Sequence, residues 1–291
     1  MRERSGPSRH HSEASLVLRR FLRHRLAVAS LVVLLALVLL AVVGGWVWKY
    51  SYADLTPDNS MPPSWDHPFG TDAAGHDTFA QVLRGTQISI RISVLVALIA
   101  TVVGTLWGAT AGYYRGWLDT VMMRLADLIL TLPLIAVAAL LAHHVGGSWW
   151  LIALVIAALQ WAYVARVARG VVLSLREKEF VEAARALGAS DARIILRHLL
   201  PNALGAIIVN GTILVALAIL LETALSYLGF GVRPPDTSLG LLVSDAQTAV
   251  QARPWLFFFP GLFIILIALT INFIGDGLRD AFDPQQSRGR R

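Results

Sequence analysis

The chain has 291 residues, of which 56% are hydrophobic and only 15% are charged, with a formal net charge of +6 at pH 7. A soluble domain carries about 25% charged residues, so a soluble globule could not cover this much apolar surface. Cysteine is absent, which excludes disulfides, cysteine-ligated zinc, iron–sulfur clusters and thiol nucleophiles. The composition predicts an all-α integral membrane protein.

Six stretches are long and apolar enough to cross a bilayer, which takes about 20 residues of helix. The first lacks charge and is not followed by a signal-peptide cleavage site, so we expect it to be retained. The third contains Pro133 near its middle, and Gly146-Gly147 separates it from the fourth. The six predicted spans are residues 26–48, 92–114, 125–141, 148–164, 201–221 and 254–274.

Positive charge is distributed unequally between the two sides that these spans define. The segments on one side hold only Lys49, Arg84, Arg91, Arg233 and Arg253, and every other lysine and arginine lies on the side of the termini. Lysine and arginine in short loops are retained in the cytoplasm. The pattern therefore predicts that both termini are cytoplasmic.

The arginine clusters at 2–25, 166–197 and 288–291 could suggest a nucleic-acid partner. Their only aromatic residues are Phe21 and Phe180, which are too few for a platform on which bases stack. We expect no nucleic acid and take membrane lipid as the surroundings of the spans.

The chain divides into a basic cytoplasmic N-terminus (1–25), the first transmembrane helix (26–48), an extracytoplasmic segment (49–87), a domain with spans two to six (88–276) and a cytoplasmic tail (277–291). The segments 49–87 and 230–253 are long and rich in proline and glycine, which favours turns over long helices. Long irregular loops are more often functional than idle. We expect these two to contact a partner outside the cell membrane.

The most informative segment lies between spans four and five. Apolar residues at i, i+3, i+4 and i+7 predict a short helix whose face is formed by Phe180, Ala183, Ala184 and Leu187. Gly188 follows as a C-terminal stop. A second helix should then run into span five at Pro201. From these residues alone, the short helix could contact another protein or lie among lipid headgroups.

This segment contains Glu182-Ala183-Ala184, then three residues, Gly188, twelve further residues and Pro201. The spacing resembles the EAA loop of binding-protein-dependent ABC importer permeases. The stretch Arg197–Asn202 resembles the dipeptide, oligopeptide and nickel branch of that family, in particular its C-type subunit with an N-terminal extension. His198 stands where the general pattern has isoleucine.

Three further stretches agree with this branch: Phe69–Asp77, Glu222–Gly231 followed by Pro234-Pro235, and Gly275–Asp280. The likeness extends from about residue 16 to residue 284. One departure is His76, where the branch commonly has arginine.

The resemblance implies the type I ABC importer fold, with 88–276 as the ABC transmembrane type-1 domain and 176–201 as its coupling loop. It implies that Phe180, Glu182, Ala183, Ala184, Leu187 and Gly188 couple the spans to a cytoplasmic ATPase, with Pro201 as a hinge into span five. The expected partners are a homologous permease subunit in a heterodimer, two ATPase subunits or domains, and an extracytoplasmic peptide-binding protein.

The sequence contains no nucleotide-binding motif. A P-loop requires G-x-x-x-x-G-K-[ST], and neither Lys49 nor Lys178 stands in that context. There is also no G-x-S-x-G or H-E-x-x-H motif, so we expect no catalytic residues. ATP and Mg²⁺ would bind to partner subunits, and no cofactor would bind to this chain.

Two other groups of residues could carry a function. His67 and His76, with nearby aspartates, superficially resemble a metal loop, but EF-hand spacing is absent and a turn-rich packed segment is the better interpretation. Glu222 should lie near the outer end of span five, where it could form a gate or an ion pair with Arg91.

We therefore predict the permease subunit of an ATP-driven peptide importer in a prokaryotic cytoplasmic membrane. Nickel or another small solute is an alternative cargo within the same family. A secondary transporter driven by an ion gradient is the alternative from another class, although the span centres lack the charges that such proteins use.

Overall fold

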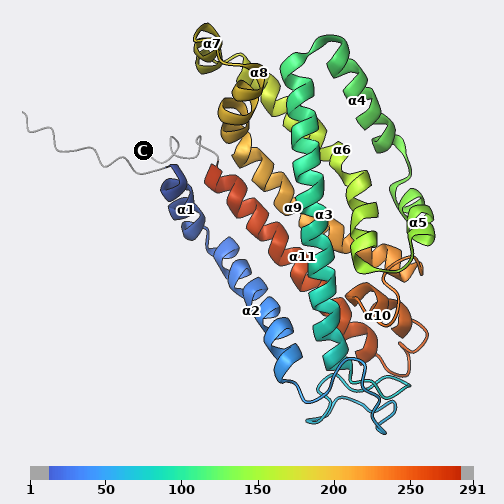
Figure 1. The fold of residues 1–291 in the computed structure, drawn as a ribbon. Coiled ribbons are helices and arrows are strands. Elements are labelled where there is room, and N and C mark those ends of the chain that lie inside the picture. The colour runs from blue at the N-terminus through green and yellow to red at the C-terminus, as the bar shows by residue number, and fades with distance from the viewer. Residues whose placement is uncertain (1–12, 283–291) are drawn as a thin grey trace, which may run out of the picture.

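The computed structural model describes residues 13–282, which form an elongated bundle of helices without a β-strand in that range (Figure 1). The helices are α1 (Glu13–Arg23), α2 (Arg25–Val47), α3 (Thr78–Tyr114), α4 (Gly116–Thr131), α5 (Leu134–Val145), α6 (Trp149–Arg176), α7 (Glu179–Ala186), α8 (Asp191–Arg193), the π-helical turn η1 (Ile194–Leu199), α9 (Leu200–Tyr227), α10 (Leu239–Ala246) and α11 (Trp255–Phe282).

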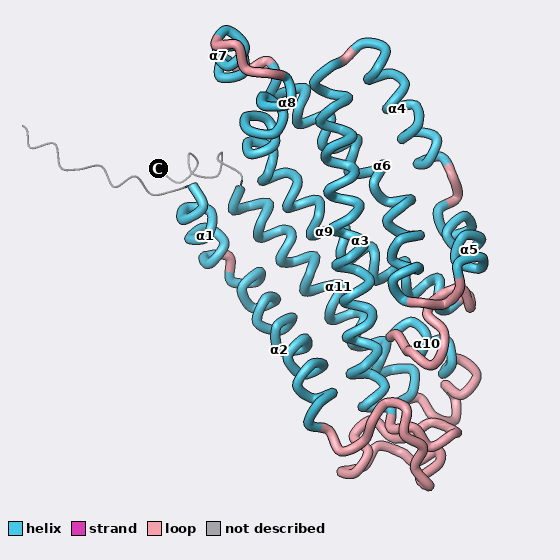
Figure 2. Tube along the Cα trace, in the orientation of Figure 1, coloured by secondary structure: helices cyan, strands magenta, loops and turns pink. Residues whose placement is uncertain are grey.

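The two ends of the bundle differ in structure. Helix α7 projects from one end, and the long loop before α3 gathers beside α10 at the other (Figure 2). We call these the α7 end and the α10 end. Helix α1 packs against the C-terminal part of α11, where His24 approaches Asp280 at 3.5 Å. Both ends of the described chain therefore lie on the same side.

Five helices in the described range are long and apolar enough to cross a membrane, and the bent pair α4–α5 would be a sixth span. The pair bends by 87° because the chain is extended at Leu132 and Pro133, where proline disfavours a helical residue before it. The predicted third span over 125–141 is therefore broken at Pro133: its first part belongs to α4 and its second part to α5.

The direction of α3 and α6 shows that the bent pair crosses the bundle. Gly104 of α3 faces Trp161 of α6, and Gly112 faces Arg169 and Val172, so the two helices run parallel. Since α3 ends where α4 begins, and α6 starts after α5, the pair must return the chain from the α7 end to the α10 end. The described bundle therefore has six crossings.

A seam of small residues joins α3 to α6. Gly104, Gly108 and Gly112 follow one another at four-residue spacing on α3, and a Cβ on Gly108 would overlap the carbonyl oxygen of Ala165. Small residues at this spacing allow the backbones of membrane helices to approach closely. The spacing is visible in the sequence, but only the fold shows that α6 is the helix packed against it.

Four of the expected spans are longer than the apolar runs indicated, and α3 and α6 show the largest extensions at a single end. Helix α3 begins at Thr78 rather than residue 92, because the Asp77 side chain accepts a hydrogen bond from the Ala80 amide at 2.7 Å and caps it. The expected irregular segment 49–87 therefore contains the first turns of α3. Helix α6 continues to Arg176, twelve residues beyond the expected end.

The surface of the bundle is apolar where lipid would contact it. Helix α2 is the least buried of the candidate spans, and it exposes Leu35, Leu39 and Val43. Inside, aliphatic clusters fill the space between α3, α6 and α9 and between α2, α9 and α11. An apolar exterior around an apolar interior is the arrangement that a bilayer stabilises.

Candidate functional site

Helix α7 is attached to the bundle by two residues at i, i+3 spacing. Val181 and Ala184 are buried, and they pack with Val172 of α6, Tyr113 of α3 and Ile194 of η1. The predicted apolar face of α7 is therefore only partly correct. Ala184 points into the protein, and Val181, which was not among the predicted residues, is its main anchor.

The other predicted residues of this helix are free to meet a partner. Phe180 is 38% exposed and Leu187 is 88% exposed, and Glu182 and Ala183 also lie on the surface. Contact with a partner would remove the apolar area of Leu187 from water, which is favourable, so its position suits a contact surface. We call Phe180, Glu182, Ala183 and Leu187 the α7 face.

Gly188 ends α7 with a complete Schellman motif. The Gly188 amide donates to the Arg185 carbonyl at 2.9 Å, and the Ala189 amide donates to the Ala184 carbonyl at 3.1 Å. Gly188 has φ +76°, a conformation in which a side chain would be strained. The predicted helix stop is present, and its cause is this backbone conformation.

The chain then enters α9 without a break. Helix α8, η1 and α9 form one candidate span of 37 residues, Asp191–Tyr227, so the helix starts ten residues before Pro201. The Leu200 amide donates to the Ile195 carbonyl, which is the π-type spacing of η1, and Pro201 lies within the first turn of α9. A displacement of α7 would therefore be transmitted along a continuous helix.

A polar cluster around Tyr113 holds the base of this loop, and no pattern in the sequence indicated it. The Tyr113 hydroxyl donates to Asp191 at 2.6 Å, and the guanidinium groups of Arg176 and Arg185 lie 5.6 and 5.3 Å from its ring centroid. Arg176 also donates to the Tyr113 carbonyl. The residues come from α3, α6, α7 and α8, so only the fold brings them together.

A bidentate ion pair fixes α4 to α6 near the α7 end. Arg169 donates from Nε and Nη2 to the two carboxylate oxygens of Asp119, each at 2.6 Å. Arg166 forms a second, more exposed pair with Asp127. Paired arginine and carboxylate groups are the common way to hold charge at the margin of a membrane span.

At the α10 end, Glu222 is fully buried and its partners are serines. The hydroxyls of Ser226 and Ser238 donate to Oε1 at 2.7 and 2.6 Å, and Ser89 donates to Oε2 at 3.2 Å. Within residues 13–282 no ion pair joins Glu222 to Arg91, whose side chain is exposed. The expected ion pair is therefore wrong: Glu222 is fully buried among serines, whereas the Arg91 side chain is exposed.

The Glu222 cluster also orients the start of α10. Ser89 accepts a hydrogen bond from the Leu239 amide, and Ser238 accepts one from the Leu241 amide, each at 3.2 Å. Each serine hydroxyl has a single proton, which it gives to Glu222. The carboxylate thereby ties α3, α9 and α10 together.

Glu222→Leu is expected to loosen α10, because it leaves buried hydroxyl donors without an acceptor at about 1–3 kcal/mol each. Hydrogen exchange of residues 239–246 should become faster in the detergent-solubilised protein. Glu222→Gln keeps one acceptor oxygen and should show a smaller change. Equal protection in Glu222→Leu and the unchanged chain would contradict this role.

The two histidines considered as metal ligands are each paired with an aspartate. His67 Nδ1 lies 2.6 Å from Asp77 Oδ2, and His76 Nδ1 lies 2.8 Å from Asp72 Oδ2. Asp77 also caps α3 and accepts from Trp48 Nε1 at 3.2 Å. No group of three or more potential ligands gathers in the described part of the chain. The segment is packed onto the start of α3, as its turns indicated.

Fold and sequence comparisons define the class of protein. The chain is similar to the MetNI methionine ABC transporter in an inward-facing conformation, with a TM-score of 0.58 and 17% identity over 70% of this chain and 97% of that one. The fold is thus that of the type I ABC importer permeases.

The family follows from the sequence. Residues 104–288 match the model for the binding-protein-dependent transport system inner membrane component, and residues 12–63 match the N-terminal TM domain of oligopeptide transport permease C. The chain belongs to this family of binding-protein-dependent permeases, and it is a multi-pass protein of the bacterial inner membrane.

Relatives match the chain over nearly its whole length. The oligopeptide transport system permease protein OppC of Mycobacterium tuberculosis is 44% identical over 96% of this chain and 97% of its own length. OppC of Haemophilus influenzae is 40% identical over 92% and 87%. A putative peptide permease protein of Brucella suis is 44% identical over 91% and 89%.

Proposed function

We propose that this chain is the C-type permease subunit of an ATP-driven importer of oligopeptides. The observation that carries the proposal is the 44% identity with OppC over 96% of the chain, which includes both the N-terminal helix and the permease domain. The exposed α7 face gives that assignment a physical mechanism.

The proposed orientation places the α7 end in the cytoplasm and the α10 end outside. Arg176, Lys178 and Arg185 lie on α7 or next to it, and Arg166 and Arg169 lie in the half of α6 that leads to it, whereas few cations lie in the segments around α10. Retention of positive charge in the cytoplasm supports this direction. The described ends of the chain, at Glu13 and Phe282, would then both be cytoplasmic.

In this proposal, two cytoplasmic ATPase subunits bind ATP and Mg²⁺, and one of them contacts the α7 face. Glu182 offers a negative charge, Ala183 permits close approach, and Phe180 and Leu187 bury apolar area on contact. Closure of the ATPases would move α7, and the continuous helix Asp191–Tyr227 would carry that movement across the bilayer. The populations of inward-open and outward-open states would shift accordingly.

A second, homologous permease subunit would complete the pathway, and an extracytoplasmic binding protein would deliver the peptide. The loop that precedes α3 and the segment between α9 and α10 lie together at the α10 end, as a docking surface requires. Cargo choice would rest largely with the binding protein.

The test is uptake into vesicles that contain the complete transporter. Labelled tripeptide should enter only when ATP is supplied on the α7 side, and it should continue to enter when ion gradients are collapsed. Uptake that persists without ATP but stops without an ion gradient would instead establish a secondary transporter. ATP-dependent uptake of nickel without peptide would disprove the peptide assignment but not the ATP-driven mechanism.

A further inference from the structure

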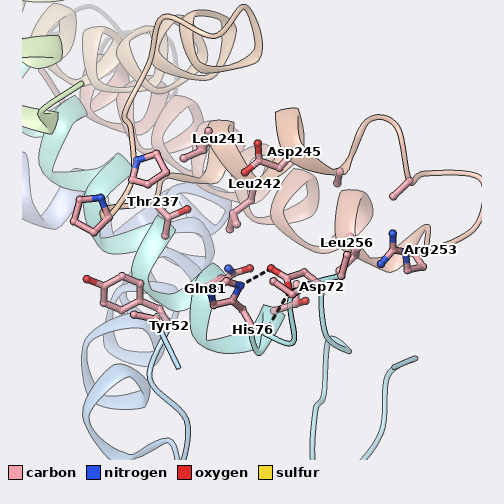
Figure 3. A pocket seen from close by; sticks show the side chains of 18 of the residues that line it. Tyr52, Asp72, His76, Gln81, Thr237, Leu241, Leu242, Asp245, Arg253 and Leu256 are labelled. Carbon is pink, nitrogen blue, oxygen red and sulfur yellow. Dashed lines mark hydrogen bonds and ion pairs between the residues drawn. The ribbon is translucent and has the colours of Figure 1, made fainter. Parts of the chain in front are cut away.

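A cavity of about 580 Å³ opens at the α10 end (Figure 3). Its walls come from the loop before α3, the first turns of α3 and α11, the segment after Pro234, and α10. Because these walls are loops and helix ends, the cavity lies at the rim of the bundle. A group bound there would be at a docking position and outside the core of the spans.

The cavity has more negative than positive groups. Asp72, Asp236 and Asp245 line it, and Arg253 is its lining arginine. Asp72 is bonded to His76 at 2.8 Å, and Asp236 is bonded to Arg84 at 2.5 Å. Arg253 is already engaged, since it donates to the Ser60 hydroxyl at 2.6 Å.

Asp245 is the third carboxylate of the cavity, and it differs from Asp72 and Asp236 because it has no partner among the described residues. Its side chain forms no hydrogen bond or ion pair with any residue in the range 13–282. Partial burial, and then the negative charge of Asp72, raise the pKa of Asp245 above its ordinary value. Two carboxylates that repel each other across a cavity are stabilised when a cation enters it.

Two buried threonine hydroxyls provide an independent indication of a ligand. Thr78 and Thr237 line the cavity, are 2% and 7% exposed, and have no hydrogen-bond partner for Oγ1 among the described residues. Thr78 belongs to the start of α3, and Thr237 to the segment before α10, so they come from separate walls. Buried hydroxyls normally form hydrogen bonds, so an unpaired hydroxyl that lines a polar cavity indicates a hydrogen-bond partner on a ligand.

We propose that this cavity binds a cationic side chain, lysine or arginine, that the extracytoplasmic binding protein presents on docking. Asp245 would neutralise the charge while Thr78 and Thr237 accept its N–H groups. A lysine ammonium has three donors and no acceptor, which suits a carboxylate and two hydroxyl oxygens. The proposal rests on the proposed function for the identity of the partner and on the proposed orientation.

The test measures binding directly, so that it does not depend on transport. The complete transporter in lipid nanodiscs is titrated calorimetrically with N-acetyl-lysine-N-methylamide and N-acetyl-arginine-N-methylamide, and with the uncharged norleucine analogue. One or both charged probes should bind and the norleucine analogue should not. Asp245→Asn should weaken binding by at least about tenfold, a free-energy change of about 1.4 kcal/mol. Asp54→Asn is the control, because Asp54 is an exposed carboxylate that does not line the cavity.

Thr237→Val and Thr78→Val separate a binding role from a structural one. Each removes an unpaired buried hydroxyl and keeps the shape, so the thermal stability should stay equal or rise while probe binding falls. The binding protein should also dock more weakly to Asp245→Lys, and reversal of one of its own basic residues should restore docking.

Three results would overturn the proposal: unchanged probe binding in Asp245→Asn, no binding of either charged probe, or binding of free Ala-Ala but not of the acetylated probes. The last result would make the cavity a cargo site. Failure of the peptide-import assignment would instead leave probe binding intact and appear only in the uptake assay.

Discussion

Glu182→Lys is expected to reduce ATP-dependent uptake about 100-fold, since reversal of a contact charge costs several kcal/mol and about 2.8 kcal/mol corresponds to that factor. Glu182 is exposed on α7 and its side chain forms no hydrogen bond or ion pair with another described residue, so the chain itself should fold and insert normally. Uptake by the complete transporter in vesicles and co-purification of the ATPase subunits measure the effect.

The matched control is Glu179→Lys, which makes the same charge change on the same exposed helix outside the predicted motif. It should retain most of the uptake. If both variants transport normally, the α7 face does not couple the chain to an ATPase. If both lose uptake equally, net charge and not the Glu182 contact is responsible.

Gly188→Val extends the same prediction to the geometry of the loop. A β-branched residue at φ +76° is strained, so the Schellman turn should shift and the ATPase subunits should no longer co-purify. Gly229 ends α9 at φ +83° with the same pattern of hydrogen bonds, and a Cβ there also meets nothing within 4 Å. Gly229→Val should cause equal strain but leave the ATPase subunits attached.

Gly108→Leu should produce the largest loss of stability in the bundle. The new side chain would meet the backbone of Ala165 and Arg169, which cannot move aside as a flexible side chain could. Overpacking of this kind costs about 3 kcal/mol. The melting temperature of the detergent-solubilised protein should fall, and the yield of folded protein should fall with it.

Gly170→Leu provides the comparison for that variant. Gly170 lies on the neighbouring helix α6, is exposed, and has nothing within 4 Å of a Cβ. Its melting temperature should stay close to that of the unchanged protein. An equal fall in both variants would show that hydrophobicity and not the α3–α6 contact decides the outcome.

The α7 loop shows which structural features could be predicted from the sequence and which could not. The periodicity of Phe180, Ala183 and Leu187 and the stop at Gly188 are local features, and they predicted the helix and its end. The choice of residues that face inward was not a local feature of the sequence. Val181 and Ala184 are buried because Tyr113 and Val172 lie beneath them, and those residues come from other helices.

For Glu222, the sequence predicted the position but not the hydrogen-bond partners. Its depth near the α10 end was predicted from the helical rise, but its partner was not. The sequence suggested Arg91, at the outer end of span two, as its partner. The fold instead supplies Ser89 and Ser238, which lie 133 residues before Glu222 and 16 residues after it. A hydroxyl has no signature in a hydropathy pattern, so only the packing of α3 and α10 could reveal it.

Residue types at short spacing were enough to specify the membrane class, the approximate spans, the family and the α7 helix. Other features became visible only once the helices were packed together: the 87° break at Pro133, the parallel seam of α3 and α6, the Tyr113 and Glu222 clusters and the acidic cavity at the α10 end. These features depend on contacts between helices that are far apart in the chain. The free energy of such contacts comes from shape and from paired polar groups, which no local pattern records.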